Sequence, residues 1–502
     1  MSDQPKSHFE RFLAPILASR FFTISALIHL VIVILIGGRV LFNKYVEPPD
    51  FQSAGDSVSA DLPPAPPDTP DNTLPPAPTL AAPPPPSTSA PAANLAALTS
   101  LNTTNSAFAM PVPAIAPPTL SKNMNAPTSA AVAGTGPAVA LPGAMSGRGN
   151  GRESVGRSYG EKGQSEEAVL RALRWLQSKQ NGDGTWGQGE YHDAWTGLAL
   201  LCFLGHGDIP QTSHEFGVVV TNALNAMITE GNAHQGRFSG TDNFGGTPAA
   251  YMHAICTYAL CEAYTMTKDQ RLAPLVQQSM KYIIQGQRPD GGWAYSYDLG
   301  PDVGGKVKSD TSVSGWQIQA LKAAHLTGIS PMDKDVLPVF AKAIKNMDRV
   351  FDEKNGTFGY RTAGDNHPYL TGVGVLAKLY WFGRPDRTVR EGFKTIESKD
   401  LNYRGPDCNL YAWYYDTQAA FQAQSGHWDW WNQRFQDQLT NNQSSDGSWP
   451  PTDGNDIGSF AKSSDDQGAL YRTTLCCLML EVFYRYLPTT QESALSGNVE
   501  GL

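Results

Sequence analysis

The stretch Ile283-Ile-Gln-Gly-Gln287-Arg-Pro-Asp-Gly291-Gly-Trp293 decides the fold, because two other segments repeat its cadence. In each copy a helix with an apolar end leads to Gln, then to Gly four residues later and to Trp six residues later. The other copies run from Gln180 to Trp186 and from Gln443 to Trp449. Each copy holds an Asp-Gly pair, which is typical of turns. A repeat of this kind predicts an architecture built from one repeated supersecondary unit.

Weaker copies fill the intervals between the three strong ones. Asn232 leads to Gly236 and Phe238, and Asp352 leads to Gly356 and Phe358, while Tyr403 marks a further copy. The repeat aromatics then fall at positions 186, 238, 293, 358, 403 and 449. Each interval is long enough for two helices and two turns.

The helices expected after each turn are apolar on all sides, which is typical of buried helices. The helices that precede the turns, such as 166–180 and 272–287, are amphipathic and should form an outer layer. Six buried helices inside six amphipathic ones predict an all-α, six-hairpin α/α toroid over residues 163–490. The alternative is an open solenoid, which would expose both terminal repeats. The expected inner helices lie near 193–204, 249–265, 311–326, 369–381, 410–424 and 469–486.

The turn motif resembles the Q-x-x-x-G-x-W repeat of squalene–hopene cyclases and its weaker form in protein prenyltransferase β subunits. The resemblance implies that Gln and Trp tie each outer helix to the next turn. It therefore implies a structural role for Gln180, Trp186, Gln287, Trp293, Phe358, Gln443 and Trp449.

The chemistry of those families is only partly present. Squalene–hopene cyclases protonate an alkene with Asp-x-Asp-Asp, and the comparable segment, Val307-Lys-Ser-Asp310, keeps one acid. A lone Asp at a helix start is typically a cap, and Lys308, if close, would lower its pKa. Asp465 and Asp466 are a second pair of weak acid candidates, because one of two neighbouring carboxylates can have its pKa raised by the other. A Ser- and Gly-rich loop such as theirs is, however, usually solvated.

Zinc and other cofactors are not expected. Prenyltransferases hold zinc with Asp, Cys and His, whereas Asp407 and Cys408 are adjacent here and no His follows at a matching position. The sequence therefore predicts no metal and no cofactor. The six cysteines lie mostly in apolar helical runs, where buried free thiols are usual, and they do not decide the redox compartment.

Aligning the expected inner helices places polar and aromatic side chains at one level, as the lining of a cavity for an elongated or aromatic ligand. In the alternative interpretation these aromatics simply fill the ring, His253 is a hydrogen-bonded core residue, and Arg472 pairs with Asp416. The candidate lining residues are Trp195, Thr196, His253, Ser314, Trp316, Thr371, Trp413, Tyr414, Tyr415, Asp416, Tyr471 and Arg472.

The N-terminal region predicts one transmembrane helix over residues 21–42, after a cytoplasmic tail at 1–20. A signal peptide is the alternative, but the apolar run ends in Arg39 and Lys44 rather than at a small-residue cleavage site. This topology predicts an inner-membrane protein with a periplasmic C-terminal domain.

Ser25 and His29 lie on one face of that helix, where polar side chains are costly and indicate function. In the alternative interpretation, the Ser25 hydroxyl hydrogen-bonds to the backbone of its own helix, and His29 lies in the interfacial zone of the membrane. The Ser-x-x-x-His pair followed by a Pro-rich spacer resembles the anchor of the TonB energy transducers. That resemblance implies a proton-channel protein as a membrane partner.

Residues 47–162 are expected to be a disordered linker, because 22 of the 37 prolines lie between Glu47 and Met145. Its last part, 147–162, mixes Arg148 and other basic residues with Gly, which is typical of a solvated hinge; the alternative is a contact with an anionic group. The tail 491–502 is also expected to be disordered. The formal net charge of -9 and the lack of a long basic run argue against nucleic acid as a partner.

Two functional classes remain open from the sequence. The first is a membrane-anchored, exported toroid that binds a ligand or a protein without catalysis. The second is a terpenoid cyclase or prenyltransferase-type enzyme that acts on an isoprenoid or another elongated apolar substrate with altered catalytic residues. The incomplete acid and zinc motifs favour the first class.

Overall fold

The computed structural model describes residues 141–239, 249–297, 309–329, 332–365, 367–454, 456, 460–489 and 494–498. All of them belong to one compact unit, Pro66–Leu502. The predicted transmembrane helix, with Ser25 and His29, and the Pro-rich spacer up to residue 140 lie outside the described residues. Among the helices that are described, none combines the length and the apolar character needed to cross a membrane.

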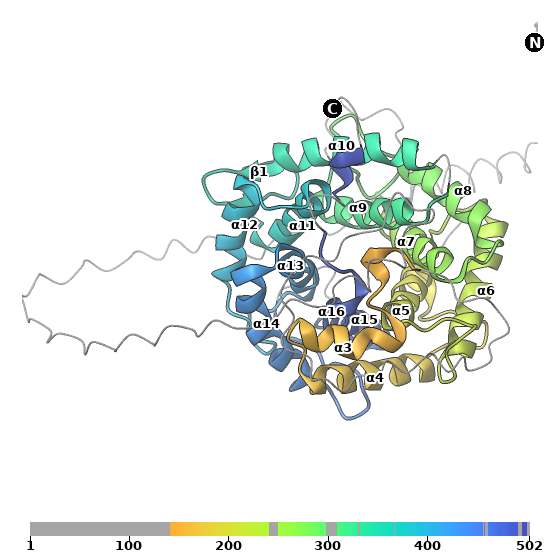
Figure 1. The fold of residues 1–502 in the computed structure, drawn as a ribbon. Helices are drawn as coiled ribbons and strands as arrows, with labels where there is room; N and C mark the ends of the chain where they lie inside the picture. The colour runs from red at the N-terminus through yellow and green to blue at the C-terminus, as the bar shows by residue number, and fades with distance from the viewer. Residues whose placement is uncertain are drawn as a thin grey trace, which may run out of the picture. The chain divides into compact units, whose positions relative to one another are not determined.

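The described residues form a double ring of helices (Figure 1). The inner helices are apolar on all sides, and each outer helix buries one face against them. The inner ring consists of α5 (His192–His206), α7 (Ala249–Thr267), α9 (Thr311–Leu326), α11 (Thr371–Phe382), α13 (Leu410–Ala423) and α15 (Asp466–Leu480). The outer ring consists of α4 (Gly163–Ser178), α6 (Gly217–Ala233), α8 (Leu272–Gln285), α10 (Met332–Val350), α12 (Arg387–Glu397) and α14 (Ser425–Thr440).

The inner ring is closed. Each inner helix contacts the next one along the chain, and α15 contacts α5. The closing unit pairs the last inner helix, α15, with the first outer helix, α4. The Gln443 side chain joins the last repeat turn to the first outer helix, because its Nε2 donates to the carbonyl of Ala168 at 2.8 Å and to that of Gly447 at 2.9 Å. The fold is therefore the predicted α/α toroid and not an open solenoid.

The strong repeats share one set of hydrogen bonds. Gln287 Nε2 donates to the carbonyls of Gly291 at 2.8 Å and Val339 at 2.7 Å, and Trp293 Nε1 donates to the carbonyl of Ile283 at 2.8 Å. Gln180 with Trp186, and Gln443 with Trp449, make the same pattern. Each Gln thus clamps its turn to the next outer helix, and each Trp closes the turn on the helix before it.

The Gly of the repeat is required by its backbone conformation. Gly291 has φ +92°, and a Cβ at this position would lie 2.2 Å from the carbonyl oxygen of Lys342. The weaker repeat at Phe358 is different, because it contains a short antiparallel pair, β1 (Phe351–Asp352) with β2 (Thr357–Phe358). This pair is the one departure from the all-α expectation in the part of the chain that the structure describes.

One end of the ring, where the inner helices finish, is covered by terminal segments, and we call it the sealed end. The elements there are η1 (Gly143–Met145), η2 (Gly149–Gly151), α3 (Arg152–Ser158), α16 (Val482–Arg485) and η6 (Leu495–Asn498). The amide of Leu487 donates to the carbonyl of Ala144 at 2.8 Å. Ala494 and Leu495 are buried, so part of the expected disordered tail packs on the ring.

Arg148 corrects the expectation of a solvated hinge over 147–162. Its side chain is fully buried, and its Nη1 lies 2.7 Å from Oε2 of Glu262 on α7. Its Nε also donates to the carbonyl of Arg485 at 2.9 Å. The segment is ordered because a buried charge is held by a buried partner, and the packed domain begins before residue 163.

His206 gives the sealed end a pH dependence. Its Nδ1 lies 2.7 Å from Oδ2 of Asp208 and its Nε2 lies 3.2 Å from Oε1 of Glu166. Burial lowers the pKa of His206, but the hydrogen bonds to Asp208 and Glu166 outweigh it and raise this pKa to about 9. Because the folded pKa exceeds the unfolded one, the stabilisation is complete below about pH 6.5 and is lost as the pH rises through about 9.

We therefore expect the free energy of unfolding to fall by roughly 3 kcal/mol between about pH 6 and pH 10 on account of His206. Urea unfolding of the parent protein and of His206→Gln at several pH values measures this difference. His214→Gln, at an exposed loop position, is the control and should keep the parent pH dependence. An identical pH dependence in His206→Gln would contradict the assignment.

Candidate functional site

The mouth of the ring, where the inner helices begin, lies opposite the sealed end and carries two groups of aromatic side chains. The first is the tyrosine cluster, defined here as Tyr251, Tyr295, Tyr360 and Tyr411 around Asp310. The second is the tryptophan cluster, defined as Trp195 with Tyr191, Phe460 and Tyr471. Tyr251, Tyr295, Tyr191 and Phe460 are each partly exposed, so a ligand can reach both groups.

Hydroxyl groups connect the tyrosine cluster to the start of α9. Tyr251 donates to the Ser312 hydroxyl at 2.5 Å, and Tyr411 donates to the Ser312 carbonyl at 2.6 Å. The hydroxyls of Tyr295 and Tyr360 lie 3.1 Å apart. The cluster therefore combines aromatic surface with hydrogen-bonding groups that are already fixed in position.

Asp310 is the N-cap of α9. Its Oδ1 accepts from the amides of Ser312 at 2.8 Å and Val313 at 3.3 Å, and the residue is 1% exposed. Burial raises the pKa of Asp310, against hydrogen bonds from Ser312 and Tyr360 that lower it. Desolvation outweighs the hydrogen bonds among the described residues; Lys308, whose proximity was expected to lower the pKa of Asp310, lies outside the described residues.

The second pair of acid candidates is solvated. Asp465 is the N-cap of α15 and accepts from the amide of Gly468 at 2.7 Å, and this hydrogen bond lowers its pKa. The Asp466 side chain is 82% exposed and lies 3.1 Å from Nζ of Lys179. Neither carboxyl is protected from water, so neither suits the protonation of an alkene.

The tryptophan cluster lies on η3 (Gly189–Tyr191), α5, α15 and the loop before α15. The ring of Phe460 packs edge-on against Trp195 at 5.2 Å and against Tyr191 at 5.5 Å. Tyr471 donates its hydroxyl hydrogen bond to Oδ1 of Asp456 at 3.0 Å. This group offers a second partly exposed aromatic surface beside the tyrosine cluster on the same end of the ring.

Four of the predicted lining residues hold the repeat turns instead of facing the ring axis. Thr196, His253 and Ser314 accept hydrogen bonds from the amides of repeat aromatics, and Arg472 donates to the carbonyl of one. They occupy equivalent positions on four inner helices, which explains why they align in the sequence. The pairs are Thr196 with Trp186 at 3.0 Å, His253 with Phe238 at 3.3 Å, Ser314 with Trp293 at 3.0 Å and Arg472 with Trp449 at 2.8 Å.

The remaining predicted lining residues are packed in the ring. Trp316 stacks on Tyr414 with ring centroids 5.2 Å apart, and Tyr415 packs beside them. Trp413 and Thr371 are buried. Asp416 lies 3.2 Å from Nζ of Lys399 and does not pair with Arg472, while burial raises the pKa of the Asp416 carboxyl. At this level of the ring, aromatic side chains therefore fill the space between the inner helices.

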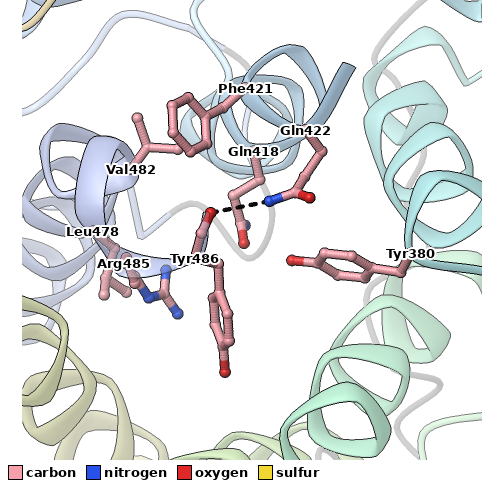
Figure 2. Close-up of a pocket in the computed structure, with 8 residues that line it drawn as sticks. All are labelled: Tyr380, Gln418, Phe421, Gln422, Leu478, Val482, Arg485 and Tyr486. Carbon is pink, nitrogen blue, oxygen red and sulfur yellow. Dashed lines mark hydrogen bonds between the residues drawn. The ribbon is translucent and has the colours of Figure 1, made fainter. Parts of the chain in front are cut away.

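A small cavity lies nearer the sealed end (Figure 2). Its polar groups are only partly satisfied. Gln422 donates to the carbonyl of Tyr486 at 3.1 Å and Arg485 Nη2 donates to the hydroxyl of Tyr258 at 2.6 Å, whereas Nε of Arg485 is buried without a hydrogen-bond partner among the described residues. The lining residues are Tyr380, Gln418, Phe421, Gln422, Leu478, Val482, Arg485 and Tyr486.

A prenyltransferase-type zinc site is not assembled around Asp407 and Cys408. Cys408 is buried, and burial raises the pKa of its thiol, which opposes the thiolate that zinc requires. Asp407 is exposed on the adjacent turn. All six cysteines are free and buried.

The tyrosine cluster was missed by the sequence analysis, although a signal for part of it exists. Tyr295 and Tyr360 each lie two residues after a repeat aromatic, Trp293 and Phe358. At this offset the chain has left the turn and runs towards the start of the next inner helix. Comparison of the repeats at that position would have selected both tyrosines.

Comparison with solved structures finds proteins that match about two thirds of this chain and nearly the whole of their own. An inactive variant of the α-1,6-mannanase GH76A of Salegentibacter with α-1,6-mannotriose has 12% identity, covers 64% of this chain and 99% of its own, and gives a TM-score of 0.48. A GH76 α-mannanase of Bacteroides thetaiotaomicron has 12% identity, with 66% and 98% covered and a TM-score of 0.45. A type II terpene cyclase of Scytonema with geranylgeranyl dihydroxybenzoate has 12% identity, with 64% and 98% covered and a TM-score of 0.42.

These three likenesses carry no argument about activity, because the identities are low and the TM-scores are below 0.5. No family model and no curated protein matches the chain.

Proposed function

We propose that this chain is a non-catalytic binding protein, in which an exported toroid takes up an elongated ligand at its mouth and an N-terminal helix anchors it to the inner membrane. The observation that carries this proposal is that none of the three candidate acids is both shielded from water and accessible to a ligand. Asp310 is 1% exposed, and the side chains of Asp465 and Asp466 lie in solvent.

The composition of the mouth supports a ligand with apolar faces and hydroxyl groups. Partly exposed aromatic rings provide apolar contact, and tyrosine hydroxyls provide directional hydrogen bonds. Tyr251 and Tyr295 pack against one another with centroids 5.6 Å apart, so the surface is formed before a ligand arrives. A preformed aromatic surface loses little conformational entropy on binding.

An enzyme of the terpenoid cyclase type is the second candidate, and one observation favours it. The raised pKa of Asp310 keeps a proton on the carboxyl more readily than on an ordinary Asp. However, a proton donor must reach the reacting atom; Oδ1 is engaged by the start of α9, and Oδ2, which the cap does not use, is buried. The buried cap therefore fits a structural role better than a catalytic one.

Binding can be tested with two probes, geranylgeraniol in detergent micelles and α-1,6-mannotriose, by following tyrosine and tryptophan fluorescence. We expect one of them to bind, and Tyr295→Ala to weaken it about tenfold or more, because a partly exposed ring in the contact is lost. Tyr264→Ala, at the opposite end of α7, is the matched control and should bind as the parent does. Equal affinity of both variants would exclude the mouth as the site.

The membrane part of the proposal rests on Ser25 and His29, since polar side chains within a membrane helix typically face a protein partner. We expect a photo-cross-linking amino acid in place of His29, in the full chain in its native membrane, to capture a TonB-type proton-channel protein. The same amino acid in place of Leu27, on another face, is the control. Cross-links from residue 29 to lipid alone would contradict the proposal.

A further inference from the structure

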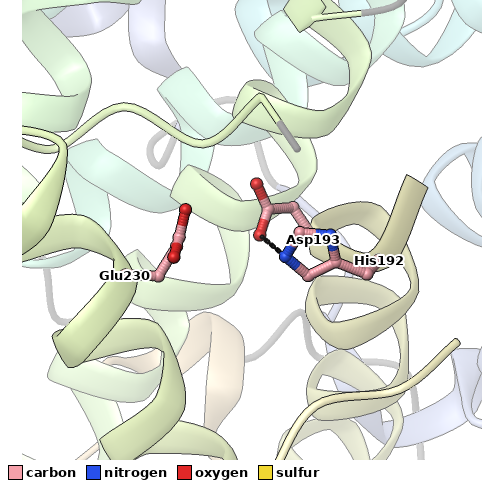
Figure 3. Close-up of side chains that lie close together, drawn as sticks. All are labelled: His192, Asp193 and Glu230. Carbon is pink, nitrogen blue, oxygen red and sulfur yellow. Dashed lines mark ion pairs between the residues drawn. The ribbon is translucent and has the colours of Figure 1, made fainter. Parts of the chain in front are cut away.

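A histidine and two carboxylates meet at the outer side of the mouth (Figure 3). His192 and Asp193 begin α5, and Glu230 lies near the end of α6. One possible ligand atom from each residue lies within 4.8 Å of the others. The three side chains come from two helices, so an ion held among them would link α5 to α6.

The surroundings of His192 point to a positive charge at this place. Its Nδ1 lies 2.9 Å from the carbonyl oxygen of Gly189, and its Nε2 lies 3.2 Å from Oδ1 of Asp193. A neutral imidazole has one N–H, whereas here both ring nitrogens face acceptors. When Nδ1–H donates to Gly189, the Nε2 lone pair lies on the side of the Asp193 carboxylate, where a metal cation would be held between the two.

The hydrogen bond to Gly189 is also the arrangement that prepares a histidine for metal binding. A metal-bound histidine usually donates its other ring N–H to a carbonyl or carboxylate, which fixes the tautomer and the ring orientation. His192 therefore presents Nε2 towards the two carboxylates in the form that a metal ion requires. The Asp193 side chain is 5% exposed, so the first carboxylate is fixed by its surroundings.

We propose that His192, Asp193 and Glu230 bind a divalent transition-metal ion, with Zn²⁺ as the preferred ion. Mixed imidazole and carboxylate ligands suit zinc, whereas calcium and magnesium prefer oxygen ligands alone. Three protein ligands leave a fourth position for water or for a polar group of a bound ligand. The site adjoins Tyr191 of the tryptophan cluster, so such an ion would extend the mouth.

The geometry allows the ligands to close around an ion. Ligand atoms bonded at about 2.0–2.2 Å to a tetrahedral zinc ion lie roughly 3.5 Å apart, which requires a contraction from the present arrangement. The side chains of His192 and Glu230 are 30% and 36% exposed, so both can move without disturbing the core, although Oε1 of Glu230 would exchange its present contact with His234 Nε2, at 3.3 Å, for the ion. Glu230 also lies in the last turn of α6, where the helix dipole favours a cation.

Zinc titration of the full chain tests the proposal. The chain is purified in detergent without a polyhistidine tag, treated with a chelator and titrated with ZnCl₂ in a calorimeter. We expect one equivalent to bind, and His192→Gln and Glu230→Gln each to weaken binding at least about tenfold. His214→Gln, at an exposed position outside the cluster, should bind zinc as the parent does. Thermal unfolding without zinc verifies that each variant is folded.

Cobalt substitution checks the ligand set, because Cys256 lies close by and donates to the Asp193 carbonyl at 3.1 Å. We expect visible cobalt bands without the intense thiolate-to-cobalt absorption in the near ultraviolet. Folded His192→Gln and Glu230→Gln variants that bind zinc as tightly as the parent would overturn the proposal, and so would a strong thiolate band or a parent protein that binds no zinc.

Discussion

Trp293→Ala is expected to lower the free energy of unfolding by about 3–5 kcal/mol. The indole is 0% exposed, and its Nε1 donates to the carbonyl of Ile283 at 2.8 Å. Truncation removes the packing of a whole ring and leaves a buried carbonyl without its donor. The surrounding turn cannot collapse into the space, because Gln287 holds it against the next outer helix.

Urea unfolding of a chain that begins at residue 141 measures this effect, since the sealed end is then complete. Trp430→Ala is the matched control: it removes the same side chain from α14, where the indole is partly exposed, and should cost about 1 kcal/mol or less. Equal destabilisation by the two variants would show that the repeat Trp is not the clamp that the hydrogen bonds indicate.

Arg148→Ala should be nearly as damaging, because it leaves the Glu262 carboxylate buried without its charge partner. Both side chains are 0% exposed and their charged groups lie 2.7 Å apart. Breaking a buried ion pair from one side costs about 3–5 kcal/mol. We expect the midpoint of urea unfolding to fall accordingly, and a chain that begins at residue 163 to be destabilised at least as much.

Two further variants test whether the loss of stability comes from the buried ion pair or from the loss of any positive charge. Arg157→Ala breaks an exposed ion pair with Glu153 and should cost no more than about 1 kcal/mol. The double variant Arg148→Met with Glu262→Leu should be more stable than Arg148→Ala, because it removes both charges of the ion pair and not one alone. A double variant as unstable as the single one would assign the loss to packing of the terminal segment.

The six hairpins could be predicted from the sequence because their signals are local. Gln, Gly and Trp lie within seven residues of one another in each strong repeat, and the hydrogen bonds that they make recur in all three. The inner helices are apolar on all sides, which marks them as buried wherever they are placed. A closed ring was predicted because six repeats supply six inner and six outer helices.

The sealed end could not be predicted in the same way. Arg148 lies among glycines, and such a segment reads as a solvated linker. The partner that buries it, Glu262, is 114 residues away in the sequence. A single sequence gives no sign of a contact at that separation, and the burial of both charges depends on it.

The candidate site was predictable only in its location. The alignment of the inner helices identified the end of the ring that carries the site. The polar residues at the aligned positions, however, hold the repeat turns, as Thr196 and Ser314 do. The tyrosines that reach the mouth come from the turn and from the first residues of the helices. Which of two neighbouring positions faces the mouth depends on the exact start of each helix, and helix boundaries are the least certain part of a sequence-based prediction.

Turnover is the measurement that tests the central claim most directly. The chain beginning at residue 141 is incubated with squalene and, separately, with geranylgeranyl diphosphate, and the extracts are read by mass spectrometry. A binding toroid whose only buried acid, among the three candidates, is a helix cap should return both compounds unchanged. A cyclic product that disappears in a folded Asp310→Asn variant would contradict this account and establish the toroid as an enzyme.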